Sequence, residues 1–212
     1  MAGTKANEFW KDSLVSRLPG ADESTIDHEL INTLREFYRT SGSWVVRLGP
    51  IQLLPTKNLY NLSLNAQGAT VLYVLKVEYD DRPLRMFDVR PSRVNRMNPG
   101  KPVGIVGTPT PGTIEIMPVP NGDDLLPIYP TCALTSDDLN CNVPSYVRTH
   151  FYETILSGVL GRMMAHIKKP YSSPAHAQVH RQVFRSGMSE ARDMARRNFT
   201  AAEKSWRFPA WD

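Results

Sequence analysis

Apolar residues recur at intervals of three and four over two neighbouring stretches, residues 145–168 and 174–199. This spacing returns the apolar side chains to one face of an α-helix. Pro144 precedes the first stretch and Ser173-Pro174 opens the second, and both are typical of helix starts. Because only a short link separates the stretches, the pattern predicts two antiparallel helices packed as a hairpin.

The two predicted helices differ in composition. The first carries Gly158 and Gly161, which cost roughly 1 kcal/mol each relative to alanine. They predict either the close approach of another backbone or ordinary close packing within the hairpin. The second has a thin apolar stripe, so one modest face packs in the hairpin and a wide polar face remains. We expect four arginines of this helix to lie in an interface between copies of the chain: Arg181, Arg185, Arg192 and Arg196.

A third helical pattern covers residues 24–41 and ends at Gly42. Acidic residues crowd its first turn, where the helix dipole favours negative charge. A helix this short is not stable alone, so we expect it to pack on the C-terminal hairpin. Residues 1–19 are polar with few apolar positions, which fits either a short helix or an arm.

Residues 43–142 follow a different pattern, in which proline and turn residues separate short β-type runs. The runs lie at 44–48, 51–54, 59–64, 70–79, 84–89, 103–106, 113–119 and 126–134. The strongest strand is 70–79, in which side chains alternate between two faces. The runs at 51–54 and 59–64 are expected to form one hairpin, and those at 103–106 and 113–119 another.

These patterns together predict an α+β fold. Residues 1–42 and 145–199 are expected to form a helical bundle of three long helices. Residues 43–144 are expected to form an inserted β-sandwich-like module. Residues 200–212 follow as an extended C-terminal tail.

The composition is that of a globular protein. The chain has 212 residues, of which 41% are hydrophobic and 22% charged, enough for a good core. No apolar run reaches the roughly 18 residues of a membrane span, and the N-terminal sequence has no apolar export signal. Cys132 and Cys141 lack the companions of a zinc site, so we expect thiols in a reducing compartment.

The net charge of +4 is unevenly placed. Residues 146–212 contain eleven Lys and Arg against five Asp and Glu, whereas residues 1–145 contain fourteen against sixteen. The basic last third predicts an acidic protein surface or nucleic acid as a partner. A solvated helix face explains the same charge, and the sequence leaves both interpretations open.

The C-terminal tail is rich in large aromatic residues for the end of a chain. Terminal residues are usually loose unless something ties them down. We therefore expect the tail to dock on a partner or on a neighbouring copy through Trp206, Arg207, Phe208 and Trp211. The alternative is that the aromatic side chains fold back on the chain's own helices.

Few residues suggest catalysis or metal binding. The chain has no GxxxxGK(S/T) loop, no GxGxxG after a strand, no HExxH and no GxSxG. His176 and His180 stand four apart on a predicted helix, but no carboxylate stands one turn away to complete a metal site. Nothing orients Cys141 and His150 as nucleophile and base. We therefore expect neither an enzyme nor a cofactor.

Four stretches carry a resemblance to a known family. Residues 25–44 form a helix that ends in a glycine and a tryptophan, and residues 74–83 form a strand and turn. Residues 152–174 form a glycine-containing helix and a short link, and residues 175–197 form a basic last helix. This layout resembles the head–tail adaptor proteins of tailed bacteriophages, also called connector, head-to-tail joining or tail tubular proteins. The resemblance lies in layout and covers most of residues 25–200, without a sharp motif.

The resemblance implies a virion structural protein without an active site. It implies a ring, dodecameric in this family, between the capsid portal and the tail or nozzle protein, with DNA passing through the channel unbound. It places the protein at the head–tail junction of the virion, after synthesis in the host cytoplasm and without a membrane. The tail residues would then dock on the portal. A basic nucleic-acid-binding protein is the alternative, which the basic last third supports.

Overall fold

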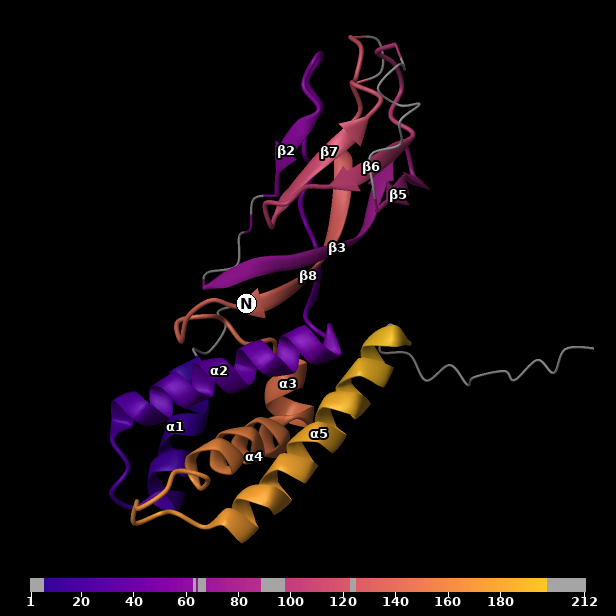
Figure 1. The fold of residues 1–212 in the computed structure, drawn as a ribbon. Coiled ribbons are helices and arrows are strands. Elements are labelled where there is room, and N and C mark those ends of the chain that lie inside the picture. Colours follow the sequence, from indigo (N-terminus) through magenta and orange to yellow (C-terminus); the bar gives the residue numbers. More distant parts are fainter. Residues whose placement is uncertain (1–5, 63, 65–67, 89–97, 123–124, 198–212) are drawn as a thin grey trace, which may run out of the picture.

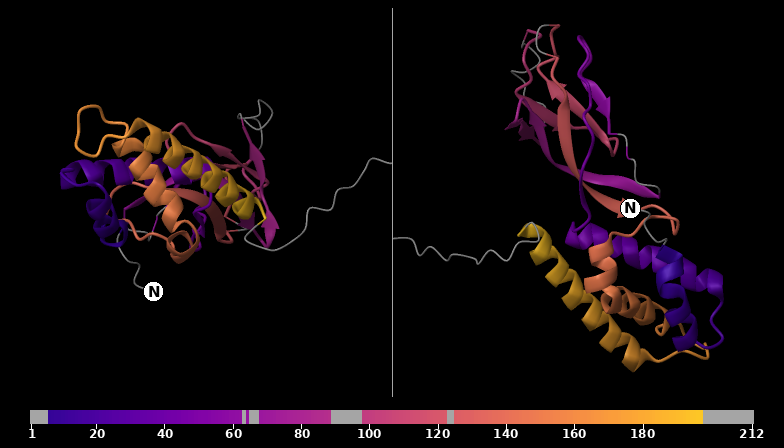
Figure 2. Two further views of the ribbon diagram at one scale, coloured as in Figure 1. Left: turned by 90° about the horizontal axis from the view of Figure 1, so that it is seen from below. Right: turned by 180° about the vertical axis from the view of Figure 1, so that it is seen from behind.

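The computed structural model describes residues 6–62, 64, 68–88, 98–122 and 125–197. The molecule is elongated, with the helices gathered at one end, a small sheet at the other and long strands between them (Figure 1). The view from behind shows the same division (Figure 2). The α+β class expected from the sequence therefore holds, since helices and sheets are segregated along the chain.

Five helices lie in the described part of the chain. They are α1 (Ala6–Arg17), α2 (Glu23–Ser41), α3 (Ser145–His150), α4 (Tyr152–Met163) and α5 (Pro174–Arg196). Helices α2, α4 and α5 pack on one another, and α1 packs on α2 and α4. Of the two forms that the first residues allowed, a short helix is the one observed.

The prediction of a bundle of three long helices is wrong. Only α5, with 23 residues, is a long helix. The stretch predicted as one helix over 145–168 is divided into α3 and α4 at Phe151, whose backbone angles (φ −118°, ψ 19°) are not helical. The break lets the Phe151 ring pack in the core, where its centroid lies 5.5 Å from that of Phe37. Apolar spacing is similar on both sides of the break, so the pattern did not reveal it.

The ends of α2 follow from its capping residues. The Asp22 carboxylate accepts a hydrogen bond from the Thr25 backbone N–H at 3.2 Å. Gly42 adopts the left-handed conformation (φ 61°) and donates its backbone N–H to the Tyr38 carbonyl at 2.8 Å. The predicted bounds of this helix are confirmed to within one residue.

Two four-stranded sheets form the β structure of the described residues. The first, the waist sheet, runs in the order β1 (Val45–Arg47), β8 (Ile128–Ser136), β3 (Ala69–Tyr79) and β4 (Arg82–Pro83). The second, the distal sheet, runs in the order β2 (Leu59–Asn61), β7 (Thr113–Met117), β6 (Gly104–Gly107) and β5 (Arg85–Phe87). Only β5 and β6 pair in parallel among these strands.

Strand β3 forms a long antiparallel ladder with β8, and its predicted bounds are confirmed to within one residue. Two register shifts interrupt the ladder, between Val71 and Tyr73 and between Val74 and Lys76. Irregularities of this kind bend a strand and re-aim its side chains. They fall in the part of β3 that lies beside the end of α5.

Of the two expected hairpins, one is confirmed and one is wrong. Strands β6 and β7 pair antiparallel as predicted. The runs at 51–54 and 59–64 do not pair with each other, because Ile51 forms a bridge with Ile128 and β2 pairs with β7. Both partners are distant in sequence, which a local pattern of turn residues cannot show.

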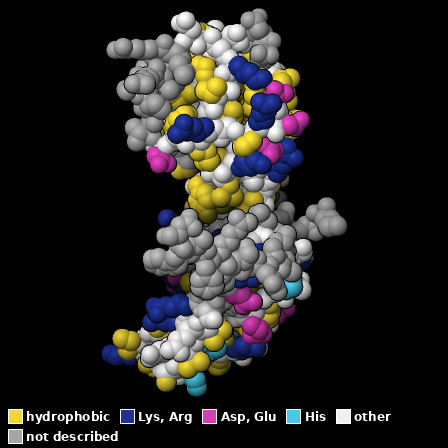
Figure 3. All heavy atoms as spheres, turned by 90° about the vertical axis from the view of Figure 1, so that its right-hand side faces the viewer, with side chains coloured by type: hydrophobic (Ala, Val, Ile, Leu, Met, Phe, Trp, Pro, Cys, Tyr) yellow, Lys and Arg dark blue, Asp and Glu magenta, His cyan; other side chains and the backbone are white. Residues whose placement is uncertain are grey.

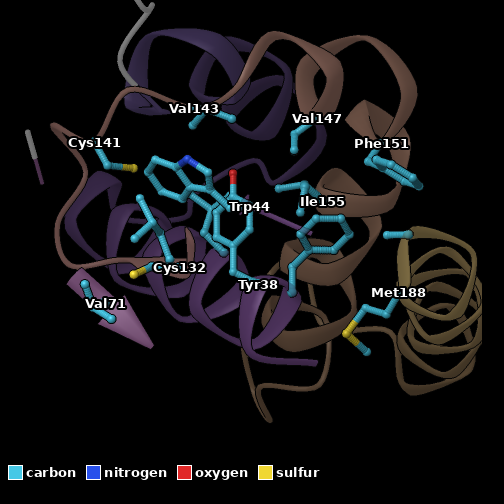
Figure 4. Close-up of a cluster of buried hydrophobic side chains, with 14 of the residues drawn as sticks. Tyr38, Trp44, Val71, Cys132, Cys141, Val143, Val147, Phe151, Ile155 and Met188 are labelled. Atoms are coloured by element: carbon cyan, nitrogen blue, oxygen red, sulfur yellow. The ribbon is translucent and has the colours of Figure 1, made fainter. Parts of the chain in front are cut away.

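One buried cluster joins the helices to both sheets. In its helical half, Tyr38 of α2 packs beside Trp44, with 5.0 Å between the ring centroids (Figure 4). In its other half, the distal sheet contributes Ile105 and Ile114, which are each 1% exposed. The core therefore runs along the molecule and fixes the helical end against the waist sheet.

Candidate interaction surface

The surface that carries the arginines of the last third is built on α5. The buried face of this helix packs on α4 and α2 through Ala177, Phe184, Gly187, Met188 and Ala191. A Cβ at Gly161 would lie 3.1 Å from the backbone nitrogen of Arg181 and 3.3 Å from the carbonyl oxygen of Ala177. The predicted close approach of another backbone is therefore confirmed at Gly161.

The four predicted interface arginines, Arg181, Arg185, Arg192 and Arg196, are all exposed on α5. Their spacing places them in one stripe along the helix, which we call the arginine stripe. Among the described residues, no carboxylate forms an ion pair with any of them. Arg181 instead donates from Nε to the Gly161 carbonyl at 3.2 Å. The stripe therefore presents positive charge that the described part of the chain does not neutralise.

Two carboxylates of α2 lie near the stripe, but both already have a partner. Arg162 of α4 lies 3.4 Å from a Glu29 oxygen and 2.5 Å from a Glu36 oxygen. Arg162 and Glu36 line the same hollow as Arg181 and Arg185. Neither carboxylate forms an ion pair with the stripe, although the single charge of Arg162 offsets only one of their two charges.

A larger hollow, of about 510 Å³, lies where the end of α5 meets the waist sheet. We call it the waist groove. Its floor holds three large apolar side chains that are 40%, 44% and 43% exposed: Val45, Tyr73 and Leu75. Cations surround this floor, and none of the residues lining the groove is a carboxylate: the cations are Arg39, Lys76, Arg192 and Arg196. Figure 3 shows hydrophobic side chains gathered at the narrow middle of the molecule.

The histidines of α5 each contact a hydroxyl group. His176 Nδ1 lies 2.9 Å from Ser173 Oγ, and His180 Nδ1 lies 3.4 Å from Ser157 Oγ. Burial, with the nearby charge of Arg17, lowers the pKa of His180, so this ring is neutral at pH 7. Across the described residues, no three His, Cys, Asp or Glu side chains come together in a set that could hold a metal ion.

The two cysteines are buried, whereas His150 is exposed. Cys141 Sγ lies 3.0 Å from Ser136 Oγ. Burial raises the pKa of the Cys132 thiol to about 11 and also raises the pKa of Cys141. Thiols that are buried and weakly acidic are poor nucleophiles.

Some predicted site residues are not placed. The tail residues Trp206, Arg207, Phe208 and Trp211 lie outside the described residues. The waist groove, in contrast, was not predicted from the sequence. Its signal was the apolar content of both faces of β3, because a strand of that kind needs a cover on each side.

The stripe and the groove adjoin, since Arg192 and Arg196 belong to both, with positive charge along α5 and apolar area at its end. None of the described helices is both long enough and apolar enough to cross a membrane. The chain matches no known protein-family model and no curated protein.

Proposed function

We propose that this chain is a head–tail adaptor, a virion structural protein whose copies form a ring between the capsid portal and the tail. The ring is dodecameric, and DNA passes through its channel without specific binding. The proposal includes no catalysis, cofactor or metal. The tail residues 200–212 anchor the ring to the portal, and the arginine stripe contacts the neighbouring copy.

The arginine stripe is the observation that carries this proposal. One face of α5 is buried in its own subunit, and the stripe lacks carboxylate partners among the described residues. Arginine is well suited to carboxylates at protein interfaces. Residues 1–145 contain sixteen Asp and Glu, so a neighbouring copy has carboxylates with which the stripe can pair. Contacts between unlike faces generate rings when the rotation closes.

The same stripe favours a second candidate, a basic nucleic-acid-binding protein. Guanidinium groups bind phosphates as well as carboxylates. The two candidates differ in their response to salt, since the affinity for DNA falls log-linearly with salt concentration in proportion to the phosphates contacted. An adaptor through which DNA passes has no such tight contact.

Electron microscopy of the purified protein, alone and mixed with the portal of its virus, tests the proposal. We expect rings seated on portals. The double variant Arg181→Glu/Arg185→Glu should abolish them, because it reverses the charge of half of the stripe. Lys168→Glu/Lys169→Glu, which reverses two charges in the exposed link before α5, is the matched control and should assemble normally.

Two results would contradict the adaptor. One is a wild-type protein that remains monomeric and does not bind to assembled portals. The other is tight binding of duplex DNA at physiological salt with a steep salt dependence, weakened in the double variant but not in the control. The second result would favour the nucleic-acid-binding candidate.

A further inference from the structure

The floor of the waist groove is a row of residues across three strands. Val45 of β1 and Tyr73 of β3 both pair with Ala133 of β8, from opposite sides, so the three residues lie on one face of the waist sheet. Leu75 lines the same groove. Grouped apolar side chains on a surface, rimmed by polar residues, mark an interaction site. The floor therefore indicates that something covers it.

The positive charge of the groove rim indicates which kind of ligand the groove binds. Arg39 from α2 and Arg192 and Arg196 from α5 form no ion pair with any carboxylate of the described chain, whereas Lys76 forms an ion pair with Glu78. A peptide that combines aromatic side chains with carboxylates fits both the floor and the rim. Aromatic side chains bring roughly 150–250 Å² of burial each.

The position of the chain end identifies such a peptide. Ala195 and Arg196 line the groove, and Arg197 is the last described residue, so the following segment starts at the rim. An extended chain spans roughly 3.3–3.6 Å per residue, which gives residues 198–212 ample length to return across the floor. A short tether also raises the effective concentration of the segment to about the millimolar range.

The segment has the chemistry that the groove requires. It contains three large aromatic residues, Trp206, Phe208 and Trp211, and two carboxylates, Glu203 and Asp212, whose charge Lys204 and Arg207 balance over the whole segment. The carboxylates suit the guanidinium groups of the rim. Trp211 and Asp212 are adjacent. If the Trp211 ring binds to the floor, the Asp212 carboxylate therefore lies near the cations of the rim.

We propose that the waist groove binds the chain's own C-terminal segment, residues 200–212, with the aromatic side chains on the floor and the carboxylates at the cationic rim. The inference goes beyond the ring and does not depend on it. It develops the alternative interpretation of the tail, in which the aromatic side chains fold back on their own subunit. It places them where the end of α5 meets the waist sheet. A partner that binds this segment must first remove it from the groove.

Fluorine NMR of the full chain labelled with 5-fluorotryptophan tests the proposal without any partner. Trp206→Phe and Trp211→Phe identify the two tail signals, and the signal of Trp10, which is 0% exposed, reports on the fold. We expect the tail signals to differ from those of a synthetic peptide of residues 200–212. In the variant Tyr73→Ser/Leu75→Ser they should move to the peptide positions, while the Trp10 signal stays in place.

The matched control removes two apolar side chains of similar exposure elsewhere. Leu54 and Leu59 are 49% and 51% exposed, and Leu54→Ser/Leu59→Ser should leave the tail signals unchanged. Arg192→Glu should shift them partly toward the peptide positions.

Three outcomes would overturn the proposal. In the first, the wild-type tail signals coincide with those of the peptide, or they have the same positions in the wild type and in the variant Tyr73→Ser/Leu75→Ser. In the second, they move on dilution, which would make the occupant the tail of a second copy. In the third, the tail signals coincide with those of the free peptide, and an oligonucleotide binds the wild type but not the variant Tyr73→Ser/Leu75→Ser. This result would assign the groove to nucleic acid. Each concerns the isolated chain, so none of them decides whether rings form on portals.

Discussion

Gly158 of α4 is a residue at which three helices approach one another closely. A Cβ at this position would lie 2.4 Å from Thr33 Cγ2 on α2 and 2.8 Å from Phe184 Cδ2 on α5. Both neighbours are buried. A glycine that costs helix propensity in α4 is therefore what allows two other helices to pack on the same turn.

Gly158→Ala should therefore destabilise the protein, although alanine is the better helix former. Overpacking costs about 1–3 kcal/mol and outweighs a propensity gain of about 1 kcal/mol. Chemical denaturation measures the free energy of unfolding. Gly49→Ala is the control, since a Cβ there meets nothing within 4 Å. An increase in stability for Gly158→Ala would contradict the close packing.

The Cys132 thiol makes stability depend on alkaline pH. Burial raises its pKa from 9.0 to about 11, so the folded chain holds a proton that the unfolded chain loses. The resulting stabilisation is complete below pH 9 and should be lost as the pH rises from 9 to 11. Denaturation of the wild type and of Cys132→Ala across this window measures it, and the variant should show the smaller slope. Equal slopes would exclude the thiol as the cause.

At the scale of elements, the sequence predicts what is determined locally. The bounds of α2 follow from Asp22 and Gly42, and the turn residues near Gly112 specify the β6–β7 hairpin. The break between α3 and α4 depends on the core that receives Phe151, and the partner of β2 depends on β7, which is far along the chain. Contacts between distant segments determine both the helix break and the strand pairing, so the local periodicity of the sequence does not predict either one.

Phe151→Ala tests whether the break is made by packing. Removal of a buried aromatic ring of this kind costs about 3–5 kcal/mol, and the ring is 2% exposed beside Phe37. We expect the melting temperature to fall sharply. Thr149→Ala, at an exposed position of α3, is the control and should change stability by less than about 0.5 kcal/mol. A small effect of Phe151→Ala would mean that the backbone breaks for another reason.

For the whole molecule, the sequence predicted the stripe but not the groove. The arginines share one face of one helix, so periodicity alone aligns Arg181 with Arg196. The groove needs three segments brought together by the fold, the end of α2, the waist sheet and the end of α5. The exposure of side chains such as Tyr73 depends on how α5 lies beside β3, which the pattern of one strand does not show.

The continuous core predicts that the helical and distal ends unfold together. The buried cluster extends from Trp10 in α1 to Ile116 in β7 without a break. Hydrogen exchange measured by mass spectrometry in increasing urea should show peptides of α2 and of β6–β7 losing protection at the same concentration. Earlier loss in β6–β7 would instead support the division into a helical bundle and an independent inserted module at 43–144, which stays a prediction.

The waist also has a mechanical consequence. Strands β1, β8 and β3 lie side by side and antiparallel where the molecule narrows, and their ladder hydrogen bonds run across the strands. A force directed along these strands loads the bonds in shear, many at once. The same strands would separate one bond at a time only under a sideways force. The ladder at the waist therefore resists a force along its strands better than a force across them.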